Sequence, residues 1–470
     1  MSEIQTKTNV EALGSEKLSR LILRLSIPAV LAMTVNLLYN LVDRLFMGHY
    51  SAEALGAVTA VMPYMTILTG FSLLAGSGAG ALISIRLGKN DRMGAQKSLS
   101  MAFVLLIGLS VLIMIPSFFL QNLILKMSGT TYTSQEMVRY ASDYLFVIII
   151  GMPFQLIGNG LVQTVRAEGS AKPAMYAVIL GAVINIALDP IFIFSLDMGS
   201  RGAAVATIIG QAATMLWVLG YYTSSRRHLS ITRQKPEWKE ARAVFGYGMP
   251  QFFIQVASAA IMLVYNHSLG RYGQLIDPVR GADVAFAAFG IITSVSLVLI
   301  MPINGLSQGI QPILGFNYGA EQYDRVKKTL LIAIGYATVW MGLGFLAAEL
   351  LPRYIIMAFN REDADLLQFG ALALRITAIF LPLVGFQQVS SNYFLSAGRP
   401  KTSSLLSMSR QVFLFIPILL FLPVLLPTDL KIYGVIWASP IADFLSAVIA
   451  AFFVIAEIRR LNRLICEEQK

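Results

Sequence analysis

The chain has 470 residues, of which 56% are hydrophobic and only 13% are charged. Soluble domains carry nearer a quarter charged residues, so this composition excludes a soluble globular protein and indicates a polytopic membrane protein. The formal net charge is +10, but the basic residues lie in short loops, which favours a topological explanation over nucleic-acid binding. The single cysteine, Cys466, excludes an intrachain disulfide and an all-cysteine metal site.

Apolar segments of membrane-spanning length follow the polar N-terminus and are separated by short polar connections. They predict an all-α integral membrane protein with twelve transmembrane helices. The first segment is too long for the core of a signal peptide, so we expect it to remain as the first helix. The twelve segments cover approximately residues 21–46, 54–83, 98–120, 138–162, 173–196, 202–223, 244–268, 284–312, 327–350, 366–389, 403–426 and 432–456.

The first segment carries a polar stripe. Asn36, Asn40 and Asp43 are spaced i, i+4, i+7, which predicts that they share one face of a helix. A carboxylate on an apolar membrane helix is costly, so this face should meet protein or water instead of lipid. If the helix begins near residue 18, Pro28 is interior, frees a backbone carbonyl and predicts a bend.

The fifth and sixth segments supply matching groups. Asn185 and Asp189 are again i, i+4, and counting residues along the helices predicts that Asp43, Asp189 and Thr207 reach one level in the outer half of the first six helices. Carboxylate, amide and hydroxyl oxygens suit a proton or Na⁺ and do not suit a soft metal. The structural alternative is that the two carboxylates are hydrogen-bonded to Asn40 and Asn185.

The basic residues predict the orientation. With both termini in the cytoplasm, 26 of the 36 Lys and Arg residues lie on the inner side and 9 on the outer side. This asymmetry favours cytoplasmic termini and a cytoplasmic linker at residues 226–242.

The chain also repeats itself. Gly169 and Lys172 align with Gly398 and Lys401 at an offset of 229, and further matches follow in order at offsets of 222 to 232. Six helices per half is an even number, so the repeat is parallel, with its pseudo-axis along the membrane normal. We therefore predict two six-helix lobes, residues 1–240 and 241–470. The other matches are Pro28 with Pro250, Gly88 and Lys97 with Gly319 and Lys328, Pro153 with Pro382, and Gly202 and Ala206 with Gly434 and Ala438.

Three charged residues lie inside the apolar segments of the second half. Arg410 and Asp443 fall at levels that an arginine side chain can bridge, and we interpret them as a buried structural pair. Arg375 lies in the tenth segment, where it either extends to the outer surface or contacts the central cavity.

Four stretches of the sequence form a recognisable combination: Pro28 with Asp43, Asn185-x-x-x-Asp189-Pro190, Val165-Arg166-Ala167-Glu168-Gly169 and Gly315-Phe316-Asn317-Tyr318-Gly319-Ala320. Together they resemble the multidrug and toxic compound extrusion (MATE) transporters, most closely the MepA-like branch, over almost the whole chain. The resemblance implies a twelve-helix antiporter that exports organic cations in exchange for H⁺ or Na⁺, with no other cofactor. It implies a bent first helix at Pro28 and a cation site in the N-terminal lobe formed by Asp43, Asn185, Asp189 and Thr207.

The function expected from these features is secondary active multidrug export across the plasma membrane by a monomer. The alternative is a flippase for lipids or lipid-linked oligosaccharides, which would need several arginines in its cavity. The sequence contains no Walker motif, HExxH motif or nucleophile elbow, which argues against an ATP-driven pump or an enzyme. Flexible sulfur and flat aromatic or amide faces suit varied organic cations, so candidate substrate contacts are Met33, Tyr39, Gln155, Asn159, Met262 and Gln308.

Overall fold

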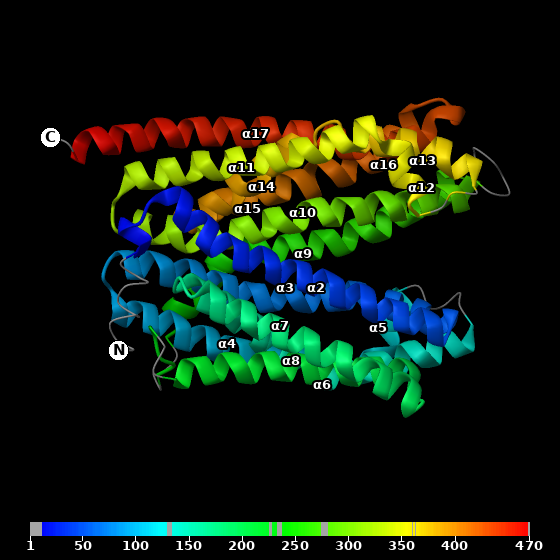
Figure 1. The fold of residues 1–470 in the computed structure, drawn as a ribbon, viewed down its shortest axis with the longest axis horizontal. Helices are drawn as coiled ribbons and strands as arrows, with labels where there is room; N and C mark the ends of the chain where they lie inside the picture. Colours follow the sequence, from blue (N-terminus) through cyan, green and yellow to red (C-terminus); the bar gives the residue numbers. More distant parts are fainter. Residues whose placement is uncertain are drawn as a thin grey trace. The chain divides into compact units, whose positions relative to one another are not determined.

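A computed structural model describes residues 12–128, 134–224, 228–232, 237–273, 281–359, 361 and 363–468. The described residues form helices and short connections, with no β-strand among them (Figure 1). Eleven of these helices are long and apolar enough to cross a membrane, and a bent pair supplies a twelfth candidate. The predicted all-α fold with twelve spans is therefore confirmed.

The contacts divide the chain into two compact units. Unit 1 contains residues 1–256, 308–322 and 396–400, and unit 2 contains residues 257–307, 323–395 and 401–470. The sequence boundary near residue 240 lies inside unit 1, because the start of the seventh span packs with the first six. Two long helices, Trp238–Gly273 (α9) and Gly281–Gly319 (α10), each contribute residues to both units.

Unit 1 is built around α6, whose span is the most buried of the candidate membrane helices. Helices α3, α4 and α8 pack against α6, and α2 packs along α7. Side-chain caps begin several helices, because Ser51, Asp91 and Ser134 each accept a hydrogen bond from a backbone N–H three residues later. The elements are α2 (Leu18–Tyr50), α3 (Ala52–Gly88), α4 (Arg92–Phe119), α5 (Gln121–Met127), α6 (Gln135–Ala167), α7 (Ala171–Pro190), the π-helical η2 (Ile191–Ser195) and α8 (Gly199–Thr223).

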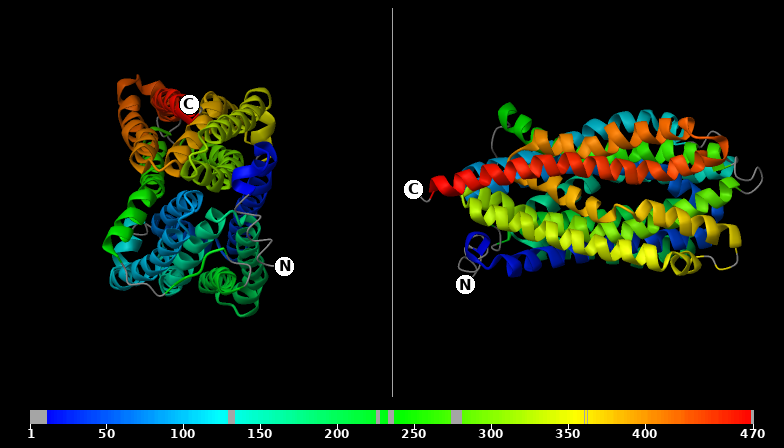
Figure 2. Two further views of the ribbon diagram at one scale, coloured as in Figure 1. Left: turned by 90° about the vertical axis from the view of Figure 1, so that its left-hand side faces the viewer. Right: turned by 90° about the horizontal axis from the view of Figure 1, so that it is seen from above.

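Unit 2 has more interrupted helices. Figure 2 shows its last helix, α17 (Lys431–Glu468), as one continuous red helix. The span before it changes from α-helical to π-helical and back. The other elements are α11 (Tyr323–Leu350), α12 (Pro352–Met357), α13 (Ala364–Ala378), α14 (Leu381–Ser396), α15 (Pro400–Met408), the π-helical η3 (Ser409–Phe415), α16 (Ile416–Leu425) and the 3₁₀-helical η4 (Thr428–Leu430).

The tenth span is broken. The segment expected as one helix at 366–389 consists of α13 and α14, which meet at an angle of 45°. Pro382 lies at the second position of α14, where its missing N–H does no harm, but it could not continue α13 without losing a hydrogen bond. The break occurs beside Pro382, although its repeat counterpart Pro153 lies inside the unbroken helix α6.

The backbone confirms the predicted repeat. Gly169 and Gly398 both have a left-handed φ, +82° and +76°, at the end of the helix that precedes the fifth span of each half. Asn90 and Glu321, 231 residues apart, also share a left-handed φ, 57° and 63°. Because non-glycine residues rarely adopt this conformation, its recurrence at the same repeat position indicates that both halves use the same turn after their second helix.

Candidate functional site

Helix α2 presents a polar face inside unit 1. The Asp43 side chain on this face is buried, with 5% of its surface exposed. The Asn40 amide donates to the Asn36 carbonyl oxygen at 2.6 Å and to Asn36 Oδ1 at 3.1 Å. Of the two bonds in the structural alternative, the one from Asn40 to Asp43 is therefore not formed, because side chains on a helix lean toward its N-terminus and Asn40 reaches the preceding turn. The other bond, from Asn185 to Asp189, is present. Among the described residues, Asp43 Oδ1 has no hydrogen-bond partner.

Asn185 connects the fifth and sixth spans. Its Nδ2 donates to Asp189 Oδ1 at 3.3 Å within α7 and to Thr207 Oγ1 on α8 at 3.5 Å. All three side chains are buried, and Asp189 is completely shielded from solvent. Within the part of the chain that the structure describes, Asn185 Oδ1 and Asp189 Oδ2 remain without hydrogen-bond partners. Buried carboxylate and carbonyl oxygens without donors are costly unless a proton, a cation or a water molecule satisfies them.

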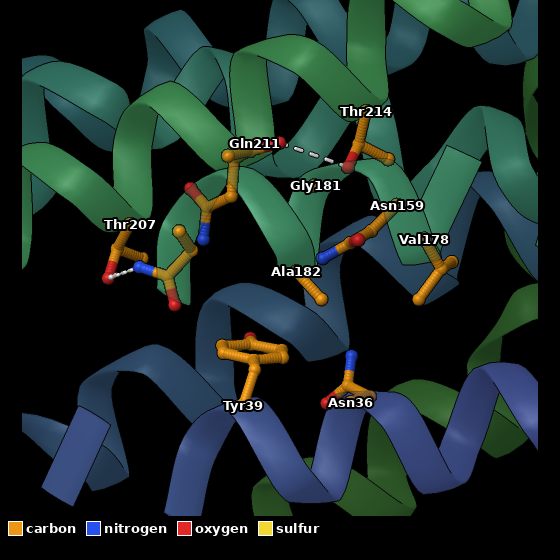
Figure 3. Close-up of a pocket in the computed structure, with 11 residues that line it drawn as sticks. Asn36, Tyr39, Asn159, Val178, Gly181, Ala182, Thr207, Gln211 and Thr214 are labelled. Atoms are coloured by element: carbon orange, nitrogen blue, oxygen red, sulfur yellow. Dashed lines mark hydrogen bonds between the residues drawn. The ribbon is translucent and has the colours of Figure 1, made fainter. Parts of the chain in front are cut away.

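A polar cavity of about 50 Å³ lies beside these groups. Figure 3 shows Asn36 and Tyr39 on α2 pointing toward the helices that carry Ala182 and Thr207. This volume is large enough to admit water. Its lining consists of Asn36, Tyr39, Asn159, Val178, Gly181, Ala182, Asn185, Thr207, Gly210, Gln211 and Thr214.

Both acids lie one helical turn beyond this cavity. Asp43 follows the lining residue Tyr39 by four positions on α2, and Asp189 follows Asn185 by four positions on α7. Four residues of α-helix advance about 6 Å. The cavity therefore lies about one turn N-terminal to each carboxylate along its helix, and a small ion or water held in it would need to move only this far.

The family of the protein follows from its sequence relatives. The MatE family model matches residues 28–191 and 278–420, which together make up more than half of the chain. The chain belongs to the MatE family.

Its similarity to individual MATE proteins extends over nearly the whole chain. Multidrug export protein MepA of Staphylococcus haemolyticus (strain JCSC1435) is 26% identical over 442 residues, which are 93% of each protein. The MATE multidrug transporter DinF-BH, solved in complex with a ligand, is 32% identical with a TM-score of 0.85, covering 94% of this chain and 96% of that one. An outward-facing multidrug resistance MATE family transporter of the MOP superfamily gives a TM-score of 0.87 at 25% identity, covering 96% and 98%. The predicted family is confirmed, and the chain is a multi-pass membrane protein.

Sequence reasoning missed two polar residues that line this cavity. Gln211 and Thr214 line the cavity from α8. Together with Thr207 they are spaced i, i+4, i+7, the same pattern that identified the stripe on α2. The spacing of these three polar residues could therefore have identified the face, but the segment contains no carboxylate to mark it.

The candidate substrate residues are distributed between the two units. Asn159 and Tyr39 line the cavity of unit 1, and Gln155 is buried nearby on α6 with its Oε1 lacking a hydrogen-bond partner among the described residues. Gln308 Nε2 lies 4.0 Å from Met33 Sδ. The Gln308 Oε1 accepts from the buried guanidinium of Arg166, a contact that the sequence analysis did not include. Met262 belongs to unit 2, where 41% of its side chain is exposed.

The charged residues of the second half have partners. Arg410 Nε lies 2.6 Å from Asp443 Oδ1. Arg375 was expected either to extend to the outer surface or to contact the central cavity. Its side chain lies at the end of α11 and is half exposed, and its Nε and Nη2 donate to the Glu349 carbonyl oxygen at 3.3 and 3.1 Å. No cluster of three or more His, Cys, Asp or Glu side chains able to hold a metal ion occurs among the described residues.

Pro28 lies inside α2, ten residues after the helix begins. Its ring removes one backbone N–H from the helix and leaves the carbonyl four residues earlier without that donor. Met33, Asn36 and Asp43 all follow Pro28 on the same helix, so a change in bend at Pro28 would move the whole polar face.

Proposed function

We propose that this protein is a secondary active antiporter that exports organic cations in exchange for H⁺ or Na⁺ by alternating access. The family supports this proposal, as do the relatives described as multidrug export proteins and the multidrug transporter DinF-BH. The observation that carries the coupling is the set of buried oxygens on Asp43, Asp189 and Asn185 that lack hydrogen-bond partners within the described chain. Binding of a small cation would lower the free-energy cost of burying these oxygens.

In the proposed mechanism, the coupling ion enters from outside and binds among these oxygens. Thr207 Oγ1 and the Asn185 side chain, which already contact each other, complete the oxygen set. A bound proton or Na⁺ neutralises part of the charge on the two acids. Asp43 lies on α2 together with Pro28, and Asp189 lies on α7, which packs along α2. Neutralisation of the acids therefore changes which bend of α2 is favoured. The two bends differ in their affinity for the organic cation.

Reciprocal coupling then drives export. If the ion and the organic cation each weaken the binding of the other, the inward ion gradient expels the organic cation. Exchange of one monovalent ion for one monovalent organic cation moves no net charge, so the concentration gradient of the ion is the driving force. The distribution of Lys and Arg supports cytoplasmic termini, and we propose that the protein acts as a monomer in the plasma membrane.

The flippase alternative receives less support. A phosphate-bearing lipid headgroup would need arginines that are free to bind it, whereas Arg375 contacts Glu349 and Arg410 pairs with Asp443. Both arginines are therefore already engaged with oxygen acceptors of the protein, which reduces the positive charge that they offer to a headgroup.

Purified protein in liposomes tests the proposal. A flat cationic rhodamine dye is loaded inside, and a proton gradient or a Na⁺ gradient is imposed alone from the other side. Dye release that follows one gradient, and that Asp189→Asn abolishes, supports ion-coupled export. Dye movement that is equal with and without either gradient would contradict the proposal.

A further inference from the structure

The repeat relates the cavity of the first half to the ion pair of the second half. At the offset of 229 that aligns Gly169 with Gly398, Gly181 corresponds to Arg410. At the offset of 232 that aligns Gly202 with Gly434, Gln211 corresponds to Asp443. Two residues that line the polar cavity in unit 1 are thus replaced in unit 2 by the two members of a salt bridge.

The polar neighbours correspond as well. Thr207 matches Ser439, and Thr214 matches Ser446, both at the offset of 232. In unit 2 both serines contact Asp443: Ser439 Oγ donates to Asp443 Oδ2 at 3.4 Å, and Ser446 Oγ donates to the Asp443 carbonyl oxygen at 3.0 Å. Of the two serine counterparts, Ser439 therefore contacts the carboxylate itself, whereas Ser446 bonds to the backbone of the same residue.

The two halves differ in what fills the space between these helices. In unit 1 the fifth and sixth spans approach closely, and a Cβ added to Gly181 would come within 2.7 Å of the Gly210 carbonyl oxygen. In unit 2 Arg410 stands in the corresponding position, and the helix is π-helical from Ser409 to Phe415. A π-helical segment accommodates an additional residue and turns a side chain in a new direction.

The charge balance differs in the same way. Asp443 is 5% exposed, and a guanidinium tethered 2.6 Å away neutralises it permanently, since arginine stays charged at all physiological pH values. Asp43 and Asp189 have no lysine or arginine within 4.0 Å among the described residues, and they retain unpartnered oxygens. The second half therefore carries a cation of its own beside its buried carboxylate, and within the described chain the first half has none at the corresponding place.

We propose that the Arg410 guanidinium is a covalently attached cation in the second half. It occupies the region that corresponds to the ion-binding region of the first half. Removal of the Arg410 side chain then exposes a site for a guanidinium-type cation at Asp443. The proposal deepens the proposed ion coupling and rests on it for its functional meaning. It implies that ion exchange takes place in the first half alone, because the corresponding region of the second half already holds the Arg410 guanidinium.

Chemical rescue tests the site independently of transport. Arg410→Ala, which leaves Asp443 without its cation, should lower the thermal stability of the purified protein. Guanidinium chloride at millimolar concentration should recover at least half of the lost melting temperature, whereas urea, which has a similar planar shape but no charge, should not. Neither compound should stabilise the wild type or the Arg410→Ala/Asp443→Asn double variant. Equal effects of guanidinium and urea on Arg410→Ala, or equal rescue of the double variant, would overturn the proposal.

A second pair of variants covers the case in which Arg410→Ala does not fold. Arg410→Gln keeps most of the side-chain volume, and with Asp443→Asn it forms a neutral hydrogen-bonded pair. The double variant should fold and retain gradient-driven dye export, whereas Asp189→Asn should lose it. Loss of gradient dependence in the folded neutral double variant would show that the second half takes part in ion exchange and would contradict the proposal. Failure of the antiport function itself would appear instead as gradient-independent transport by the wild type, while the rescue by guanidinium would be unaffected.

Discussion

The Glu240 carboxylate accepts two hydrogen bonds from the Arg86 guanidinium, at 2.6 and 2.9 Å. This bidentate pair joins the first turn of α9 to the end of α3, and Ser98 Oγ donates to the same carboxylate at 2.8 Å. The linker before α9 is attached to the same surface, because Arg92 donates to the His228 carbonyl oxygen at 2.7 Å and the Thr232 N–H donates to Ser100 at 2.9 Å. The chain therefore leaves the first six helices only after α9 has begun.

Removing the charge of Glu240 should destabilise unit 1. Glu240→Gln leaves Arg86 without its carboxylate in a partly buried site, and we expect a loss of about 2 kcal/mol, seen as a lower melting temperature of the purified protein. Glu237→Gln is the matched control, because Glu237 is 59% exposed and meets Lys97 at 3.3 Å, a surface pair that contributes little. Equal destabilisation by the two variants would argue against a structural role for the Arg86 pair.

The same region tests the orientation of the protein. Trp238 begins α9, and 76% of its side chain is exposed. In a background with the exposed Cys466 replaced by serine, Trp238→Cys should react with an impermeant thiol reagent in inverted membrane vesicles and not in intact cells, because the linker is rich in Lys and Arg. Efficient labelling from outside intact cells would reverse the predicted topology.

Glu168 makes the stability of the protein depend on pH. Its side chain is completely buried just after α6, and Tyr221 donates to its Oε2 at 3.4 Å. Burial raises the pKa of Glu168 to about 8, although hydrogen bonds from Tyr222, Tyr221 and the backbone of the linker act in the opposite direction. The folded protein therefore binds a proton that the unfolded chain has released, so this contribution to stability is complete below about pH 4.5 and is lost as the pH rises through 8.

Glu168→Gln should remove this dependence. We expect its free energy of unfolding to fall less than that of the wild type between pH 5 and pH 9, by a difference on the order of 3–5 kcal/mol at the alkaline end. Thermal melts at each pH should show the same trend as a smaller fall in melting temperature. Burial lowers the pKa of His228 to about 4, so acid destabilises both proteins below about pH 6.5, and their difference isolates Glu168. The exposed Glu321→Gln variant should follow the wild type. Identical pH profiles for Glu168→Gln and the wild type would exclude this effect.

The sequence predicted the helices better than the details of the site. Hydropathy and the repeat define the spans, because a bilayer requires long apolar helices and leaves few alternatives. Asp43 and Asp189 were recognisable because a carboxylate in an apolar helix is costly. Gln211 was not recognisable as a site residue, because a neutral amide in a membrane helix has a smaller free-energy cost than a carboxylate. The hydrogen bond from Asn40 to Asn36 could not be predicted either, because it depends on the direction of the side chain. The correspondence of Arg410 with Gly181 was contained in the repeat, but its meaning required the cavity that Gly181 lines.

Thr207 should set the affinity for the coupling ion. Thr207→Val keeps the size and β-branching of the side chain and removes the hydroxyl group that contacts Asn185 at 3.5 Å. Loss of one oxygen ligand or hydrogen bond of about 1.4 kcal/mol corresponds to a roughly tenfold weaker apparent affinity for the ion. The measurement is the ion concentration that gives half-maximal dye export in liposomes. Thr59→Val is the control, because Thr59 is exposed and bonds only to the Leu55 carbonyl oxygen of its own helix; an equal shift in both variants would rule out a specific role for Thr207.

The last prediction concerns Asp43 and Asp189 together. Replacing either by asparagine keeps the size of the side chain and removes its negative charge. The demand for a cation among the buried oxygens then falls, because one carboxylate with two amides no longer needs a neutralising ion to the same degree. The organic cation would still reach its binding site, but ion binding would no longer favour one bend of α2 over the other, and a ligand without differential affinity cannot shift a conformational equilibrium.

We therefore expect Asp43→Asn and Asp189→Asn each to abolish gradient-driven export while leaving expression and melting temperature close to those of the wild type. Dye binding without a gradient, followed by fluorescence, should persist in both variants and should lose its dependence on the coupling ion. Asp197→Asn is the matched control, since Asp197 is exposed and accepts a hydrogen bond from Tyr50 at 3.2 Å; it should export dye like the wild type. Full gradient-driven export by both Asp43→Asn and Asp189→Asn at normal expression would show that the ion is bound elsewhere, because neither variant can then be missing the group that couples ion entry to dye release.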